Sequence, residues 1–124
     1  MSDTGVATLV GERYISLTTF RRDGTTASTP VWVVSDDGRR LLVWTGARTW
    51  KVRRVRRDPR VLVASSSFRG RERAARIAGR ARIVADPGIG DLLVRKYGWQ
   101  KRLVDRLNRG SSGSGSVVLE IVDG

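Results

Sequence analysis

The sequence contains no histidine and no cysteine. These absences remove the most common general base, the thiol nucleophile and the soft metal ligands. The 12 acidic residues are scattered and form no paired-carboxylate arrangement, and Asp36-Asp37 precedes a glycine, as in a turn. We therefore expect no catalytic side chain and no metal ligand, so that any chemistry must come largely from a bound molecule.

Long apolar runs are absent as well. No stretch approaches the ~20 apolar residues of a membrane-spanning helix, and the start of the chain lacks a basic segment followed by an apolar one. The glycine motifs that bind nucleotide phosphates and dinucleotides are also missing. A chain of 124 residues is long enough for one compact core. We expect a single domain over residues 1–124 that is soluble and cytoplasmic and has no membrane partner.

Positive charge is abundant: 24 basic residues face 12 acidic ones, which gives a net charge of +12. Of the 24 basic residues, 21 are arginine, a side chain that suits bidentate phosphate recognition but is also enriched by GC-rich coding. A positive field favours anionic ligands. Because the arginines are spread over helices, turns and strands rather than gathered on one recognition element, nucleic acid is an unlikely partner.

Six segments have the composition of β-strands, since they are rich in β-branched and aromatic residues and are bounded by turn residues. They are residues 13–20, 25–35, 40–45, 60–65, 73–85 and 117–122. One substantial helix is expected to end at Asp58-Pro59, and a second to begin at Asp86-Pro87 with an interruption near Gly98. The pattern predicts a mainly β, α+β fold with two to three helices, built as an antiparallel barrel or sandwich.

The two ends of the chain add smaller elements. Residues 1–12 predict a short N-terminal helix, because Val6, Leu9 and Val10 have helical spacing. Residues 110–116 (GSSGSGS) predict a flexible loop with no packing content.

The segment from Arg48 to Arg57 holds six positive charges and no acid, and it follows a strand that ends at Trp44-Thr45. On a helix, Val52 and Val55 would face inward, and Lys51 would lie in the first turn beside them. The unpaired N–H groups of that turn, the helix dipole and the lysine together predict an anion site. The alternative interpretation is a solvated basic face, which charge runs usually form.

Several other residues are candidates. Trp32 and Trp44 fall on neighbouring strands and could flank a flat ring, although such residues more often belong to the core. Trp50 is expected near the outer face of its helix, and Tyr97 is the best remaining proton donor. Pro30 cannot donate to a β-ladder, which indicates either a bulge or a sheet edge that faces a ligand.

The order of these segments resembles the pyridoxamine 5'-phosphate oxidase-like split-barrel family, specifically its actinobacterial branch that uses the deazaflavin coenzyme F(420). The matching segments are RYISLTTFRRDGTTASTPVWVV, RLLVWTGARTWKVRRVRRDPRVLVA, GRARIV, RKYGWQKRLVDRL and VVLEI. The resemblance implies a homodimer of six-stranded antiparallel split barrels, with two cofactor sites between the subunits. It also implies hydride transfer between the reduced deazaflavin and an electron-poor small molecule, with the protein supplying binding and orientation.

The resemblance also implies where the cofactor binds. The strand around Ser28 to Trp32 would lie along the ring system, and the region from Thr45 to Arg54 would hold the phosphate. With Trp44 included, the predicted cofactor-binding residues are Ser28, Thr29, Pro30, Val31, Trp32, Trp44, Thr45, Thr49, Lys51 and Arg54.

Two alternatives stay open. One is an FMN-binding flavoprotein of the same fold, because FMN and F(420) both carry a phosphate. The other is a non-catalytic binding module for an anionic ligand or nucleic acid. True pyridoxamine-phosphate oxidase activity is disfavoured, because by resemblance that branch uses an arginine and a histidine near its carboxyl end, and this sequence has no histidine. The sequence does not identify the substrate.

Overall fold

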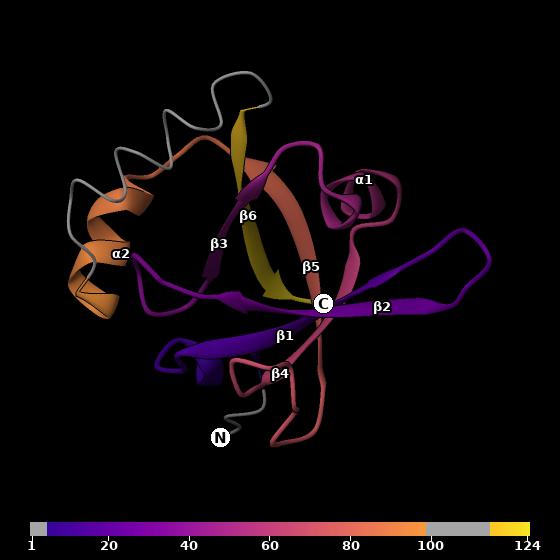
Figure 1. Cartoon of the computed structure of the whole chain (residues 1–124), viewed down its shortest axis with the longest axis horizontal. Coiled ribbons are helices and arrows are strands. Elements are labelled where there is room, and N and C mark those ends of the chain that lie inside the picture. Colours follow the sequence, from indigo (N-terminus) through magenta and orange to yellow (C-terminus); the bar gives the residue numbers. More distant parts are fainter. Residues whose placement is uncertain (1–4, 99–114) are drawn as a thin grey trace.

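The computed structural model describes residues 5–98 and 115–124. The elements follow in the order η1 (Val6–Leu9), β1 (Tyr14–Phe20), β2 (Thr26–Trp32), β3 (Leu41–Gly46), α1 (Trp50–Arg57), β4 (Arg60–Ser65), β5 (Ile77–Val84), α2 (Ile89–Tyr97) and β6 (Ser116–Asp123) (Figure 1). The six strands and the mainly β class predicted from the sequence are confirmed. No helix within the described ranges is long and apolar enough to cross a membrane.

All six strands belong to one antiparallel sheet in the order β2-β1-β4-β5-β6-β3. The sheet curls, so that β1 and β2 run across the view in Figure 1 while β5 and β6 run steeply. The two edge strands, β2 and β3, contact each other, and a β-bridge joins Val34 to Leu42 just beyond β2. The result is the split barrel that the sequence predicted, with its opening between β2 and β3.

An apolar core fills the curl of the sheet. Its fully buried members include Ile15, Leu17, Val43, Val63, Leu119 and Ile121. Each such side chain contributes about 1.5–3 kcal/mol by leaving water. Val55 of α1 joins this core and Val52 is fully buried, as the helical spacing predicted, so the two valines fix the basic helix to the barrel.

A second apolar cluster lies under α2. Ile89, Leu93 and Tyr97 pack against Leu42 and Val118. The helix ends at Gly98, which has a left-handed φ of 67° and coincides with the predicted interruption. The predicted start at Asp86-Pro87 is too early, because α2 begins at Ile89. Asp86 instead accepts hydrogen bonds from the N–H groups of Gly88 and Ile89, at 2.9 and 2.8 Å.

The predicted end segments are described only in part. The N-terminal helix is a single 3-10 turn, Val6–Leu9, and residues 1–4 lie outside the described residues. Of the predicted loop at 110–116, residues 110–114 also lie outside them, and Ser116 already belongs to β6. The part of the predicted second helix beyond Gly98 lies outside them too.

Pro30 lies in an edge strand. The register of β1 and β2 is continuous from Tyr14 opposite Trp32 to Phe20 opposite Thr26, without a bulge. Of the two explanations offered by the sequence, the sheet edge is therefore the one found, since a proline at an edge interrupts no interior ladder. This edge also borders the opening of the barrel.

Glu120 connects β6 to β5 and to the segment before β3. This buried carboxylate on β6 pairs with Arg40 before β3 at 2.7 Å and with Arg82 on β5 at 2.6 Å. The hydrogen bonds from Arg82 and Arg40 hold the pKa of Glu120 below its ordinary value. Because the two arginines satisfy its oxygens, the charge is tolerated inside the fold.

Candidate functional site

The amino end of α1 is open to an anion. Thr49 occupies the N-cap position, but its hydroxyl donates to the carbonyl oxygen of Gly46 at 3.0 Å and caps no helical N–H. The first turn contains no acidic residue. A helix leaves its first N–H groups without intrahelical partners and concentrates positive potential there. This end of α1 therefore favours a negative group.

Lys51 adds an ammonium group to the same turn. Its side chain is partly buried, and within the described part of the chain it has no hydrogen-bond or ion-pair partner. Burial lowers the pKa of Lys51 below its ordinary value of 10.5. A partly desolvated ammonium with no protein partner interacts strongly with any anion that reaches it.

The first turn of α1 and the β1–β2 hairpin enclose a cavity of about 190 Å³, which we call the anion cradle. It is lined by Thr19, Ala27, Ser28, Thr29, Thr49, Trp50, Lys51 and Arg54. Within residues 5–98 and 115–124, no acidic side chain contributes to this lining. The buried hydroxyl of Thr19 has no hydrogen-bond partner among the described residues. Buried polar groups in folded proteins are nearly always paired, so this hydroxyl is an exception beside the cavity.

A second cavity, of about 280 Å³, lies in the opening between the two edge strands, and we call it the aromatic cavity. It is lined by Tyr14, Pro30, Val31, Trp32, Trp44, Thr45, Lys51 and Phe68. Lys51 is the residue that both linings share. The side chains of Trp32 and Phe68 are 41% and 63% exposed. The aromatic lining suits a flat ring, and the shared lysine shows that the aromatic cavity adjoins the anion cradle.

The end of α2 holds the chain just beyond Trp32. The hydroxyl of Tyr97 accepts the N–H of Val33 at 3.0 Å and lies within hydrogen-bond distance of the carbonyl oxygens of Val33 and Arg13, at 2.8 and 2.7 Å. Lys96 donates to the carbonyl oxygen of Val33 at 2.6 Å. The ring of Tyr97 contacts that of Trp32, with centroids 6.1 Å apart. These contacts fix Trp32 at the edge of the aromatic cavity.

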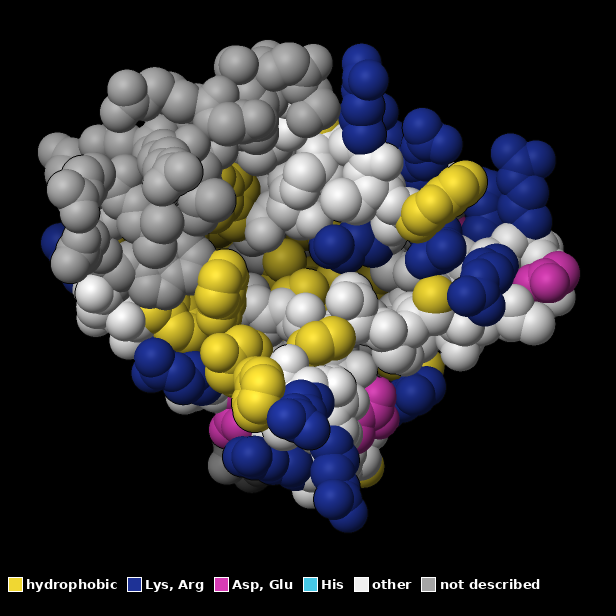
Figure 2. Space-filling model, in the orientation of Figure 1, with side chains coloured by type: hydrophobic (Ala, Val, Ile, Leu, Met, Phe, Trp, Pro, Cys, Tyr) yellow, Lys and Arg dark blue, Asp and Glu magenta, His cyan; other side chains and the backbone are white. Residues whose placement is uncertain are grey.

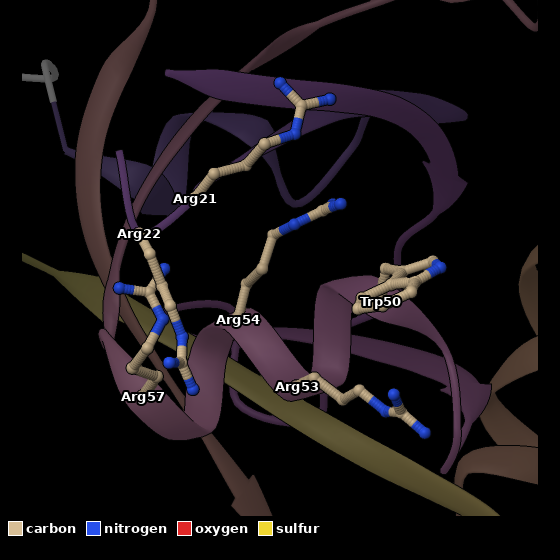
Figure 3. Close-up of a pocket in the computed structure, with 6 residues that line it drawn as sticks. All are labelled: Arg21, Arg22, Trp50, Arg53, Arg54 and Arg57. Atoms are coloured by element: carbon tan, nitrogen blue, oxygen red, sulfur yellow. The ribbon is translucent and has the colours of Figure 1, made fainter. Parts of the chain in front are cut away.

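A third cavity, of about 540 Å³, adjoins the anion cradle and is lined by Arg21, Arg22, Trp50, Arg53, Arg54 and Arg57. We call it the arginine cleft (Figure 3). It shares Trp50 and Arg54 with the anion cradle. Figure 2 shows basic side chains gathered on this part of the surface. Within the described ranges, no cluster of three or more acidic side chains could hold a metal ion.

A comparison with models of protein families identifies the family of this chain. The sequence profile of the pyridoxamine 5'-phosphate oxidase family matches residues 1–121, nearly the whole chain. The chain belongs to this family. No curated protein sequence matches it.

Solved structures of the same fold include proteins with different descriptions. A conserved hypothetical protein of Mycobacterium tuberculosis is 25% identical, with a TM-score of 0.71 and coverage of 99% of this chain and 81% of the other. An F(420) reductase is 20% identical, with a TM-score of 0.65 and coverage of 94% and 91%. A pyridoxamine 5'-phosphate oxidase-related, FMN-binding protein of Nostoc punctiforme is 16% identical, with a TM-score of 0.60 and coverage of 94% and 72%. These likenesses establish the split-barrel fold.

The structure brings together the ten residues that the family resemblance and the two strand tryptophans indicated. Ser28, Thr29, Thr49, Lys51 and Arg54 line the anion cradle. Pro30, Val31, Trp32, Trp44, Thr45 and Lys51 line the aromatic cavity. Thr45, which the resemblance grouped with the phosphate residues, lines the aromatic cavity and not the anion cradle. That these ten residues bind a cofactor stays a prediction.

The sequence analysis did not predict some of the residues that line the cavities. Thr19 was missed because only the strand register places it opposite Ala27, beside the start of α1. Tyr14 and Phe68 were missed because their contact, with ring centroids 6.4 Å apart, joins distant parts of the chain. Tyr97 is not an available proton donor, since backbone groups of Val33 and Arg13 surround its hydroxyl.

Proposed function

We propose that this protein is an oxidoreductase that binds the deazaflavin coenzyme F(420) and transfers a hydride between it and an electron-poor small molecule. The observation that carries the proposal is the position of Lys51. This partly buried ammonium, which has no partner in the described part of the chain, lines both the anion cradle and the aromatic cavity. A molecule with a phosphate next to a planar ring system would fill both at once.

The residues present fit such a cofactor. The uncapped start of α1 and the Lys51 ammonium would hold the phosphate by charge-assisted hydrogen bonds. Trp32 and Trp44 would border the ring system. When bound, the deazaflavin supplies the hydride chemistry, while the protein binds it, orients its ring and excludes water from one face. A chain without histidine or cysteine is sufficient for that role.

FMN is the second candidate. It has the same combination of phosphate and planar ring, and the structurally similar Nostoc punctiforme protein is described as FMN binding. The net charge of +12 favours the more anionic of the two cofactors, because F(420) carries additional carboxylates beyond its phosphate.

We also propose that the protein acts as a homodimer. Trp32 and Phe68 border the aromatic cavity and are 41% and 63% exposed, which is unusual for large apolar side chains at a binding site. A second copy placed over the opening between β2 and β3 would cover them and complete the ring site. The substrate would then reach the ring beside the partner subunit.

A fluorescence titration with F(420) and, in parallel, with FMN tests the proposal. In Lys51→Ala the affinity for the preferred cofactor should fall about 10- to 100-fold, the usual cost of losing one charged hydrogen bond. Arg56→Ala is the matched control, because Arg56 is exposed on the same helix and lines none of the three cavities. If both variants lost the same amount of cofactor affinity, Lys51 would act only through the general positive charge of the helix.

A further inference from the structure

The aromatic cavity contains a phenol that no protein group uses. The chain has two tyrosines, Tyr14 and Tyr97, and of these only Tyr14 lines the cavity. Backbone groups of Val33 and Arg13 surround the hydroxyl of Tyr97. The side chain of Tyr14 is half-buried, and its hydroxyl forms no hydrogen bond within the described part of the chain. This hydroxyl is therefore available to a ligand in the cavity.

The register of the sheet fixes the backbone of Tyr14. Tyr14 lies directly opposite Trp32 where β1 pairs with β2, so the two side chains project from the same face of the sheet. On the other side of β1, the carbonyl oxygen of Tyr14 accepts the N–H of Ser66 at 3.1 Å. Tyr14 is thus held from both sides before any ligand arrives, which favours a defined reaction geometry.

The ring of Tyr14 is positioned by the connection between β4 and β5. Phe68 contacts it, with ring centroids 6.4 Å apart and ring planes inclined by 54°. The connection is itself tied to β1, because the Ser16 hydroxyl donates to Glu72 at 2.8 Å. A β-bridge between Ser66 and Glu72 closes the same connection. Packing therefore orients the phenol and leaves its hydroxyl without a partner among the described residues.

The other N–H and O–H groups of the lining are poor proton donors or have another role. They belong to Trp32, Trp44, Thr45 and Lys51. An indole N–H and an aliphatic hydroxyl donate hydrogen bonds, but they are too weakly acidic to release a proton during catalysis. In the proposed function, Lys51 holds the phosphate. A tyrosine is among the side chains that act as general acids, and Tyr14 is the one left for this role in the described lining.

We propose that Tyr14 is the catalytic proton donor for a substrate that carries a conjugated carbonyl group, and this inference rests on the proposed function. The hydride from the reduced cofactor forms a C–H bond at the carbon β to the carbonyl, and the displaced π-electron pair moves to the carbonyl oxygen. The O–H bond of Tyr14 breaks as that oxygen takes the proton. The substrate, reduced by two electrons, leaves as an enol and becomes the saturated carbonyl compound. A proton from solvent restores the phenol.

The lining of the cavity suits the charge that this step creates. Hydride addition places negative charge on the carbonyl oxygen, and a phenol O–H aimed at that oxygen stabilises it before the proton moves. Within residues 5–98 and 115–124, no acidic side chain lines the cavity, and Lys51 adds a positive charge to it. The sequence led us to expect no catalytic side chain, because histidine and cysteine are absent. Tyr14 supplies the proton without either of them.

The first test needs no cofactor. Cyclohexenone with a heavy carbon isotope at its carbonyl is added to the cofactor-free protein, and infrared difference spectroscopy records the carbonyl stretching band of the bound probe. The band should lie at lower frequency in the wild-type protein than in Tyr14→Phe, because a hydrogen bond from the phenol weakens the C=O bond. Folded Tyr97→Phe is the matched control, and it should keep the low band. The same band position in Tyr14→Phe and wild type, or no bound probe in the wild-type protein, would overturn the proposal.

The second test measures reduction of cyclohexenone with reduced F(420). In Tyr14→Phe, kcat should fall about 100-fold or more, the usual contribution of a general acid. The affinity for F(420) should change less than about twofold, because Tyr14 does not line the anion cradle. The free energy of unfolding in urea should be the same in both proteins, since the hydroxyl has no partner among the described residues.

A kcat within about threefold of the wild-type value would overturn the proposal. Wild-type protein that binds F(420) but does not reduce the enone would overturn the assigned substrate class. If the wild-type protein binds neither cofactor, the proposed function fails, while the infrared band still decides whether Tyr14 donates to a carbonyl in the cavity. Failure of the proposed function is thus distinguishable from failure of the role of Tyr14.

Discussion

The hydroxyl of Thr49 donates to the carbonyl oxygen of Gly46, so the residue at the N-cap of α1 does not cap the helix. A threonine at this position usually accepts a hydrogen bond from a first-turn N–H. Here the turn is left open next to the partly buried Lys51 and the orphan hydroxyl of Thr19. The open turn and the lysine are the two features that the proposed phosphate would satisfy.

The substitution Thr19→Val should separate stability from binding. It removes a buried hydroxyl without a partner, so the free protein should gain about 1 kcal/mol in its free energy of unfolding. Because the hydroxyl has no accessible surface, the same change should alter cofactor affinity less than twofold. Urea denaturation without ligand and a titration with cofactor measure the two effects. Thr18→Val is the control, and it should lose stability, because the Thr18 hydroxyl lies 2.6 Å from that of Ser28.

Substitution of two partly buried lysines should have opposite effects on the free protein. Burial lowers the pKa of both Lys51 and Lys96. Lys51 has no partner in the described residues, so Lys51→Met should stabilise the fold near neutral pH. Lys96 donates to the carbonyl oxygens of Val10 and Val33, so Lys96→Met should destabilise it, by about 1 kcal/mol for each hydrogen bond.

The advantage of Lys51→Met should depend on pH. In the folded state Lys51 releases its proton below pH 10.5, whereas the unfolded chain retains it up to about that value. Stability of the wild-type protein therefore rises as the pH increases through this window, and its deficit relative to Lys51→Met shrinks. A deficit that stays constant from pH 7 to the alkaline limit of about 10.5 would show that the lysine charge is not its cause.

Tyr97→Phe should affect both folding and the aromatic cavity. Removal of the hydroxyl leaves the N–H of Val33 without its 3.0 Å partner, at a cost of about 1–3 kcal/mol. Because Trp32 precedes Val33 and contacts the ring of Tyr97, its position should loosen as well. We expect altered tryptophan fluorescence and weaker cofactor binding under conditions where the variant is still folded. Unchanged affinity in the folded variant would show that the contact is purely structural.

Glu120→Gln should reduce resistance to acid. The pKa of Glu120 is held below 4.5 by Arg82 and Arg40, so its ion pairs stabilise the fold above that pH and are lost as the pH falls through the lowered pKa. At neutral pH the variant should be less stable by about 1–3 kcal/mol. In urea denaturation over the acidic range, the difference between wild-type and variant should narrow. A difference that widens on acidification would contradict this account.

The features that the sequence predicted depend on local patterns. Val52 and Val55 have helical spacing, and this spacing correctly placed Lys51 beside the buried face of α1. Pro30 marked an edge strand because a missing N–H limits where proline fits in a sheet. Gly98 marked the end of α2 because a left-handed residue favours glycine.

The features that were missed depend on contacts between distant segments. Tyr97 was left as a possible proton donor, but its bonds to Arg13 and Val33 span 84 and 64 residues of sequence. The arginine cleft forms only because the turn after β1 lies against α1. Helical periodicity alone could not show that Arg54 turns back to the anion cradle, since a long side chain has many rotamers.

The most direct test of the central claim compares each cofactor with its phosphate-free counterpart. FMN is titrated beside riboflavin, and F(420) beside the bare deazaflavin, on the wild-type protein and on Lys51→Ala. If Lys51 and the start of α1 hold the phosphate, the wild-type protein should prefer the phosphorylated form at least tenfold, and this ratio should fall toward one in the variant. Equal affinities for both forms in the wild-type protein, or a ratio unchanged by the substitution, would contradict the account.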